Sequence, residues 1–202
     1  DGSKKQCPLL FDDNYQVKPS YWSFVDDTKL EPEIKTLNII ESADEEYTTA
    51  EKIILTNGDT QAEIFPEWSD EGLRILANVK NDKADASDAI TVYVSVNGTI
   101  YQQTVLCKDA KKTAQGYEAQ LMIPLEKETL QVASELLVDF VMVNGGEKTA
   151  YNDYTMNQDK SDRFYAKAVL KPYTKISGGT VTIDGERDAQ WDKAVEIPLT
   201  IR

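Results

Sequence analysis

The sequence predicts an all-β fold, namely an antiparallel β-sandwich of jelly-roll or immunoglobulin-like topology, preceded by a short N-terminal helical arm. After Gly72, and again after Asp88, apolar residues fall on every second position. This period of two is typical of strands that bury one face. Turn-forming sequences at 69–72 and 97–98 favour hairpins between such strands. Because these strands would expose an apolar face, we expect a second sheet to cover it.

Residues 1–27 show no such alternation. Proline suits the first turn of a helix, so a helix is predicted to begin at Pro19. In that helix Tyr21, Trp22 and Val25 would share one face. A helix of this length is marginal alone, and we therefore expect the arm to pack on another part of the protein.

An internal repeat divides the rest of the chain. Seven positions that begin at Ile39 share their spacing and character with seven that begin at Ile183. Such repeats mark successive units of one architecture, and the interval suits one β-sandwich. We therefore predict a polar linker over 28–34, a complete sandwich over 35–173, and the opening segment of a second module over 174–202.

Inside the sandwich the pattern predicts its elements one by one. The expected strands cover 73–79, 90–96, 98–107, 116–124, 136–143 and 164–170, and 126–135 is expected to hold one or two helical turns. Asp139 is the exception in an otherwise apolar strand. Trp68 is expected to pack in the core or at an edge. Cys7 and Cys107 are expected to be separate buried thiols, and a disulfide between them is the alternative.

The overall composition excludes several classes of function. A formal net charge of −13 supplies no basic track for nucleic acid. No apolar run approaches the length of a membrane span, so no membrane partner is expected. Histidine, the commonest general base and metal ligand, is absent from the sequence. Catalysis would have to rest on a pair of carboxylates at a defined separation, and the sequence alone does not place such a pair.

Three carboxylates form the one candidate metal site. Asp82, Asp85 and Asp88 follow one another at intervals of three residues. Hard oxygen ligands of this kind suit calcium. A solvated acidic loop explains the same residues without a metal. We expect no cofactor other than this structural calcium.

Two parts of the sequence resemble known families. Residues 8–22, Pro-Leu-Leu-Phe-Asp-Asp-Asn-Tyr-Gln-Val-Lys-Pro-Ser-Tyr-Trp, resemble the closing segment of family 10 glycoside hydrolases, which are endo-1,4-β-xylanases. That resemblance implies that 1–27 is the C-terminal tail of a (β/α)8 catalytic domain whose two catalytic glutamates lie upstream.

The remainder resembles family 9 carbohydrate-binding modules. The motifs that carry this resemblance are Ile183–Trp191 and its copy Ile39–Tyr47, together with Trp68–Leu73, Val79–Asp82, Asp88–Tyr93 and Gly116–Pro124. In that family two tryptophans sandwich a sugar, and they correspond to loops 83–87 and 157–162. Neither loop contains an aromatic residue here.

The stacking residues that remain are tyrosines. Tyr151 and Tyr154 are the leading candidates, because flat aromatic rings pack against sugar faces. Tyr101 is a third candidate, and it is expected on an exposed face beside Tyr93, where a cross-strand aromatic pair is the alternative.

The resemblances imply a non-catalytic accessory module of a secreted, multimodular xylanase. Its expected partners are plant cell-wall xylan or cellulose and the neighbouring catalytic and binding modules. Without the tryptophan pair, the module is expected to bind weakly or to act only as a spacer. An immunoglobulin-like adhesion or protein-interaction module is the alternative, because a sandwich alone would serve that role too.

Overall fold

A computed structural model describes residues 18, 21–22, 33–43, 47 and 50–173. In this part of the chain eleven strands join in one curled sheet. The strands are β1 (Thr36–Glu41), β2 (Ile53–Asn57), β3 (Thr60–Ser69), β4 (Gly72–Lys80), β5 (Ala89–Val96), β6 (Thr99–Leu106), β7 (Lys111–Thr113), β8 (Gly116–Pro124), β9 (Glu135–Asn144), β10 (Glu147–Ala150) and β11 (Ala166–Lys171). The predicted all-β sandwich is confirmed.

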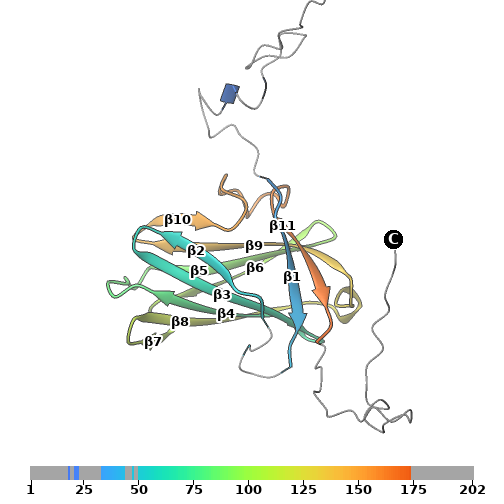
Figure 1. Ribbon diagram of the computed structural model, residues 1–202, viewed down its shortest axis with the longest axis horizontal. Coiled ribbons are helices and arrows are strands. Elements are labelled where there is room, and N and C mark those ends of the chain that lie inside the picture. The colour runs from blue at the N-terminus through green and yellow to red at the C-terminus, as the bar shows by residue number, and fades with distance from the viewer. Residues whose placement is uncertain (1–17, 19–20, 23–32, 44–46, 48–49, 174–202) are drawn as a thin grey trace, which may run out of the picture.

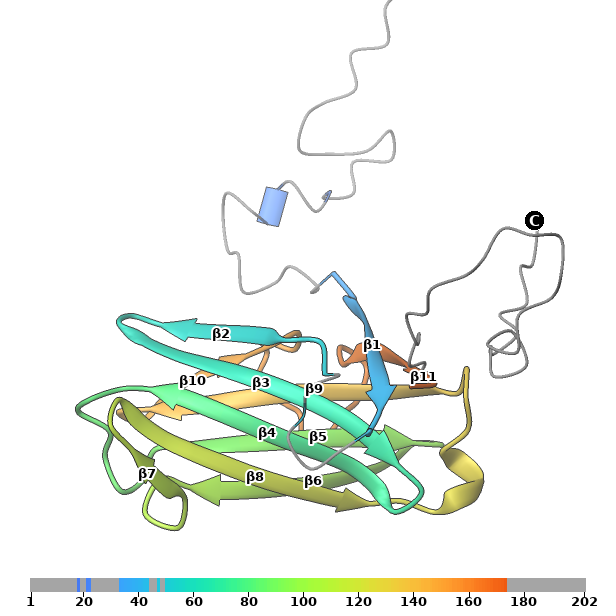
Figure 2. The ribbon, with the colours of Figure 1, turned by 60° about the horizontal axis from the view of Figure 1, so that its bottom comes forward.

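The curl of the sheet produces two facing layers (Figures 1 and 2). The strand order is β6-β5-β9-β11-β1-β3-β4-β8-β7, while β10 pairs with β9 and β2 pairs with β3. One layer therefore contains β5, β6, β9 and β10, and the other contains β2, β3, β4, β7 and β8. Strands β1 and β11 run across the long strands at one end and connect the two layers (Figure 1).

The sheet is mixed, which corrects the expectation of a purely antiparallel sandwich. Strand β1 pairs in parallel with both β11 and β3, whereas the remaining pairs are antiparallel. Alternation in the sequence reveals which face of a strand is buried but carries no information on its direction. A parallel neighbour requires a crossover connection, and here the chain passes through β2 between β1 and β3.

The core lies between the layers and is built from the residues that alternate inward. Ile75, Val92, Phe140 and Tyr117 are each at most 1% exposed. Trp68 packs with them at 4% exposure, as predicted, and its indole N–H donates to the Lys171 carbonyl oxygen at 2.8 Å. That bond joins β3 to β11 across the end of the sandwich.

The predicted strands are present with small shifts of their ends. The segment 126–135 forms a single 3-10 turn, η2 (Lys127–Thr129), and the last strand begins two residues late, at Ala166. Strands β1, β2, β7 and β10 were not among the predicted ranges, and β3 was expected only as the strand that precedes the turn at 69–72. Among the described residues no helix is long and apolar enough to cross a membrane.

Several predictions fall on residues that are not described. Of the arm over 1–27, only Lys18, Tyr21 and Trp22 are described, so the helical arm remains a prediction. Cys107 is a buried free thiol, whereas Cys7 lies outside the described residues. The segment 174–202 also lies outside them, and the module boundaries remain predictions.

The β4–β8 ladder ends on a glycine at each end. Gly72 pairs with Pro124 and Gly116 pairs with Lys80. A Cβ atom on Gly116 would lie 2.1 Å from the carbonyl oxygen of Val79, and φ at this residue is +150°. Only glycine allows the two backbones to approach this closely. The ladder joins two strands of one layer, so a side chain here would force that layer apart.

We expect Gly116→Ala to lower the free energy of unfolding by about 3–5 kcal/mol, because β4 and β8 would have to separate. Gly58→Ala is the matched control. Its φ is +56° and no atom lies within 4 Å of the added carbon, so the loss should be only about 1–2 kcal/mol. Urea denaturation followed by tryptophan fluorescence measures both. Equal losses in the two variants would show that the close approach is not a constraint.

Candidate functional site

A groove of about 430 Å³ lies on the outer face of the layer that contains β5 and β9. Its floor is lined by Thr91, Tyr93, Gln102, Val141, Val143 and Lys148, and its wall by Met156, Gln158, Asp159 and Lys160. The wall belongs to the long loop 151–165 between β10 and β11. The volume falls within the range of sites for small ligands.

Strand pairing sets the floor of the groove. Tyr93 and Thr91 alternate along β5 with core residues such as Val92, so they face away from the core. Across the β5–β6 ladder Tyr93 lies opposite Gln102. The floor thus offers a hydroxyl, a phenol and an amide side by side.

Tyr93 is the aromatic residue of the groove. Its ring centroid lies 6.3 Å from that of Tyr165, at an interplanar angle of 59°. Burial raises the pKa of the Tyr93 phenol, and the negative charges of Asp159 and Asp139 raise it further. The phenol therefore stays protonated at neutral pH and can donate a hydrogen bond.

A buried carboxylate on β9 holds the wall against the floor. Asp139 is 0% exposed. Its oxygens accept hydrogen bonds from the backbone N–H of Asn152 at 2.9 Å, the backbone N–H of Asp153 at 3.1 Å and the Gln158 amide at 3.0 Å. Burial raises the Asp139 pKa, and these donors act in the opposite direction. Each of the three donors belongs to loop 151–165, so the loop is fixed by one side chain.

Further hydrogen bonds order the rest of the loop. The Gln158 side chain also donates to the Asp153 carbonyl oxygen at 2.6 Å, and the Tyr165 hydroxyl donates to the Gln158 carbonyl oxygen. The Ser95 hydroxyl, from β5, donates to the Asp162 carboxylate. Hydrogen bonds within the chain therefore hold the wall in position without a ligand.

The groove can bind a ligand rich in hydroxyl groups. The Tyr93 hydroxyl can both donate and accept hydrogen bonds, and the Gln102 amide offers two donors and an acceptor. The Thr91 hydroxyl already pairs with that of Thr104 at 2.9 Å and keeps acceptor capacity. A single aromatic ring and two valines supply apolar surface. This combination of one ring with several polar groups suits a sugar better than an extended apolar molecule.

The tyrosines proposed for stacking do not line the groove. Tyr151 is half-buried, and its ring centroid lies 6.0 Å from that of Phe140. The Lys35 ammonium lies 4.4 Å from the centroid of the Tyr151 ring. It therefore packs against the core. Tyr154 is 45% exposed and Tyr101 is 39% exposed, and neither is among the lining residues.

Tyr93 and Tyr101 do not share a face, which corrects the expected aromatic pair. The register places Tyr101 opposite the core residue Val94. Tyr101 therefore lies on the face of the sheet that Val94 shares, whereas Tyr93 lies on the other face. The turn explains this register, because Asn97 and Gly98 both have positive φ, 51° and 79°. A two-residue turn of this kind fixes the pairing of both strands. The position of Gln102 opposite Tyr93 could thus have been predicted from the Asn-Gly dipeptide. The sequence of the wall residues contains no motif from which their position could be predicted.

The three aspartates do not form a carboxylate cluster. Asp88 is 2% exposed and accepts hydrogen bonds from the backbone N–H of Asp85 at 2.9 Å and of Gly145 at 2.8 Å. Asp85 accepts from the backbone and hydroxyl of Ser87, which lowers its pKa. In the described part of the chain no three acidic, histidine or cysteine side chains gather to hold a metal ion. The carboxylates of Asp85 and Asp88 stabilise turns, and calcium stays a prediction.

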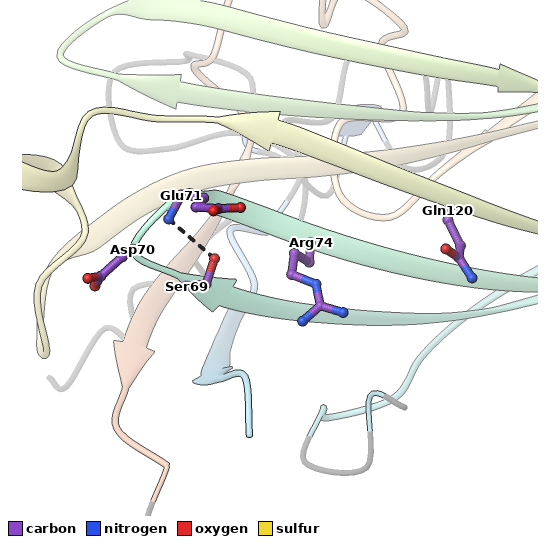
Figure 3. Close-up of a pocket in the computed structure, with 5 residues that line it drawn as sticks. All are labelled: Ser69, Asp70, Glu71, Arg74 and Gln120. Carbon is purple, nitrogen blue, oxygen red and sulfur yellow. Dashed lines mark hydrogen bonds between the residues drawn. The ribbon is translucent and has the colours of Figure 1, made fainter. Parts of the chain in front are cut away.

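A second hollow, of about 660 Å³, lies beside the turn that joins β3 to β4 (Figure 3). It is lined by Ser69, Asp70, Glu71, Arg74 and Gln120. Arg74 donates to the Ser42 hydroxyl at 2.7 Å and lies 4.9 Å from the ring centroid of Tyr47. Asp70 pairs with Lys127. Its lining residues include no aromatic ring and its arginine is already engaged, so the groove is the better candidate.

Known proteins resemble this chain in sequence and in fold, although no family model matches it. It is 26% identical to exoglucanase XynX of Acetivibrio thermocellus over 95% of this chain and 21% of that protein. It is 27% identical to endo-1,4-beta-xylanase A of Thermoanaerobacterium saccharolyticum over 96% of this chain and 20% of that protein. The chain therefore spans about a fifth of the length of these relatives.

Two solved structures share the fold. Both are a family 9 carbohydrate-binding module from Caldicellulosiruptor kristjanssonii, one in complex with cellotriose and one in complex with glucose. Each superposes with a TM-score of 0.57 at 13% identity, over 73% and 72% of this chain and all of the module. The predicted resemblance to this class of module is confirmed for the fold. These neighbours are binding modules rather than catalytic domains.

We expect Asp139→Asn to lower the free energy of unfolding by about 2–4 kcal/mol, because an amide cannot accept hydrogen bonds on both of its terminal atoms. Amide hydrogen exchange should increase selectively in loop 151–165. The matched control is Asp159→Asn, an exposed aspartate of the same loop, which should change stability by less than about 0.5 kcal/mol. An unchanged exchange pattern in Asp139→Asn would show that this carboxylate does not hold the loop.

Proposed function

We propose that this chain is a non-catalytic carbohydrate-binding module that accompanies the catalytic domain of an extracellular xylan-degrading enzyme. The observation that carries the proposal is the groove, where Tyr93 and Gln102 form a hydroxyl- and amide-bearing floor on a binding-module fold. The complexes of the structural neighbours with cellotriose and glucose support the ligand class. The xylanases among the sequence relatives support the setting.

The binding-module proposal is favoured over the immunoglobulin-like adhesion alternative. The solved neighbours named above are carbohydrate-binding modules, and no feature of the described residues points specifically to a protein partner. A β-sandwich by itself favours neither function.

The groove is built for weak binding. Met156 and Gln158 occupy its wall, in the loop region where a second aromatic ring would complete a sandwich around the sugar. One aromatic contact contributes about 0.5–1.5 kcal/mol beyond burial. Millimolar affinity already requires about 4 kcal/mol, which the ring and a few hydrogen bonds can supply together. We therefore expect a Kd of about 1 mM for short oligosaccharides.

The neighbouring segments complete the proposed arrangement. We assign 1–27 to the end of a catalytic domain, 28–34 to a linker and 174–202 to the opening of a second module. The sequence similarity to the xylanases covers 95–96% of the chain and so extends into these segments. This supports an architecture in which weak modules act in series, where linked sites gain avidity without new contacts.

Adjacent residues on β6 provide the test. We expect Gln102→Ala to weaken cellotriose and xylotriose binding by about five- to tenfold, because it removes one hydrogen-bonding group of the floor. Tyr101→Ala is the matched control, since Tyr101 sits on the same strand but on its opposite face. Titration followed by amide chemical shifts in NMR measures the affinity.

The outcomes separate the alternatives. Binding that survives Gln102→Ala but is lost in Tyr101→Ala would place the site on the other face of β6. Wild-type protein that binds neither oligosaccharide would identify the module as a spacer.

A further inference from the structure

Two lysines that form no ion pair with any carboxylate of the described residues line the groove. Lys148 comes from β10 and Lys160 from loop 151–165, and both are exposed. The ion pairs that the structure shows in the described residues involve Lys52, Lys80, Lys111 and Lys127, and neither groove lysine takes part in one. Both ammonium groups are therefore available to a ligand.

This arrangement is unusual for so acidic a chain. A formal net charge of −13 disfavours the binding of anions by the chain as a whole. The groove lining differs, because it carries two lysines and one carboxylate, Asp159. The buried carboxylate of Asp139, opposite Tyr93 on β9, is already surrounded by hydrogen-bond donors of the chain. The neighbouring Glu147 alternates with Lys148 on β10 and is not among the lining residues. The site thus favours a negative group on a chain that otherwise disfavours one.

The neutral side chains of the floor and the two lysines would recognise different chemical groups of a ligand. Thr91, Tyr93 and Gln102 match the hydroxyls of an uncharged sugar ring. An ammonium group forms its stronger hydrogen bonds with a carboxylate. We infer that the groove recognises a sugar chain that bears a carboxylate, namely xylan substituted with a uronic acid, in preference to the unsubstituted chain. This inference rests on the proposed function and specifies its ligand.

The expected preference is modest. Each exposed ion pair should improve affinity by about 1.5- to fivefold, so the two lysines together should give roughly a fivefold preference. The preference should depend on salt, since the screening length falls from about 8 Å at physiological ionic strength to about 3 Å near 1 M. Binding of the neutral chain should change little with salt.

The test titrates the full chain with xylotriose and with xylotriose that carries one glucuronic acid. Amide chemical shifts report both affinities, at low salt and near 1 M sodium chloride. Lys148→Gln and Lys160→Gln each remove one groove charge. Lys167→Gln is the matched control, because Lys167 is an exposed residue of β11 outside the groove and its replacement changes the net charge equally.

We expect the acidic oligosaccharide to bind about fivefold more tightly at low salt, and this ratio to fall towards one near 1 M salt. Each groove variant should reduce the ratio by about half or more, whereas Lys167→Gln should leave the ratio unchanged. Equal affinity for the two ligands would overturn the inference and leave the proposed function intact. A preference that persists in both groove variants would also overturn it. Failure of both ligands to bind would overturn the proposed function as well.

Discussion

The candidate site depends on one buried carboxylate. Asp139 interrupts an apolar strand, and a charge in such a place is costly unless hydrogen-bond donors surround it. One donor is the backbone N–H of Phe140 on β9 itself, and the other three come from Asn152, Asp153 and Gln158 in the loop that follows β10. Those three bonds form only when the loop folds back over β9. The same conformation places Gln158 and its neighbours beside the floor, so one requirement of stability also builds the groove.

Successive residues of β5 point alternately into the core and towards the groove. Val92 and Val94 belong to the core between the two layers, while Thr91 and Tyr93, which alternate with them, line the groove. Residues of the outer face can therefore change without disturbing the core. The core face must stay apolar, whereas the outer face can exchange aromatic rings for amides or lysines at little cost in stability.

The sequence contained most of the fold but less of the site. Strands such as β4 and β8 were predictable because one face of each is buried and the alternation is strict. The parallel pairing of β1 was not, since direction leaves no trace in a short strand. Asp139 stood out as the exception in its strand, yet its partners lie 13 to 19 residues further on, in a loop without periodicity. Tyr151 was proposed for stacking, but composition cannot distinguish a loop tyrosine packed on Phe140 from one presented to a ligand.

A crystal structure of the chain soaked with cellotriose tests most directly whether the outer face of β5 and β9, under loop 151–165, binds sugar. Our account predicts electron density for a sugar ring in the groove, with the ring against Tyr93 and its hydroxyls within hydrogen-bonding distance of Gln102. Density over the hollow at Arg74 or beside Tyr154, with the groove left unoccupied, would contradict it.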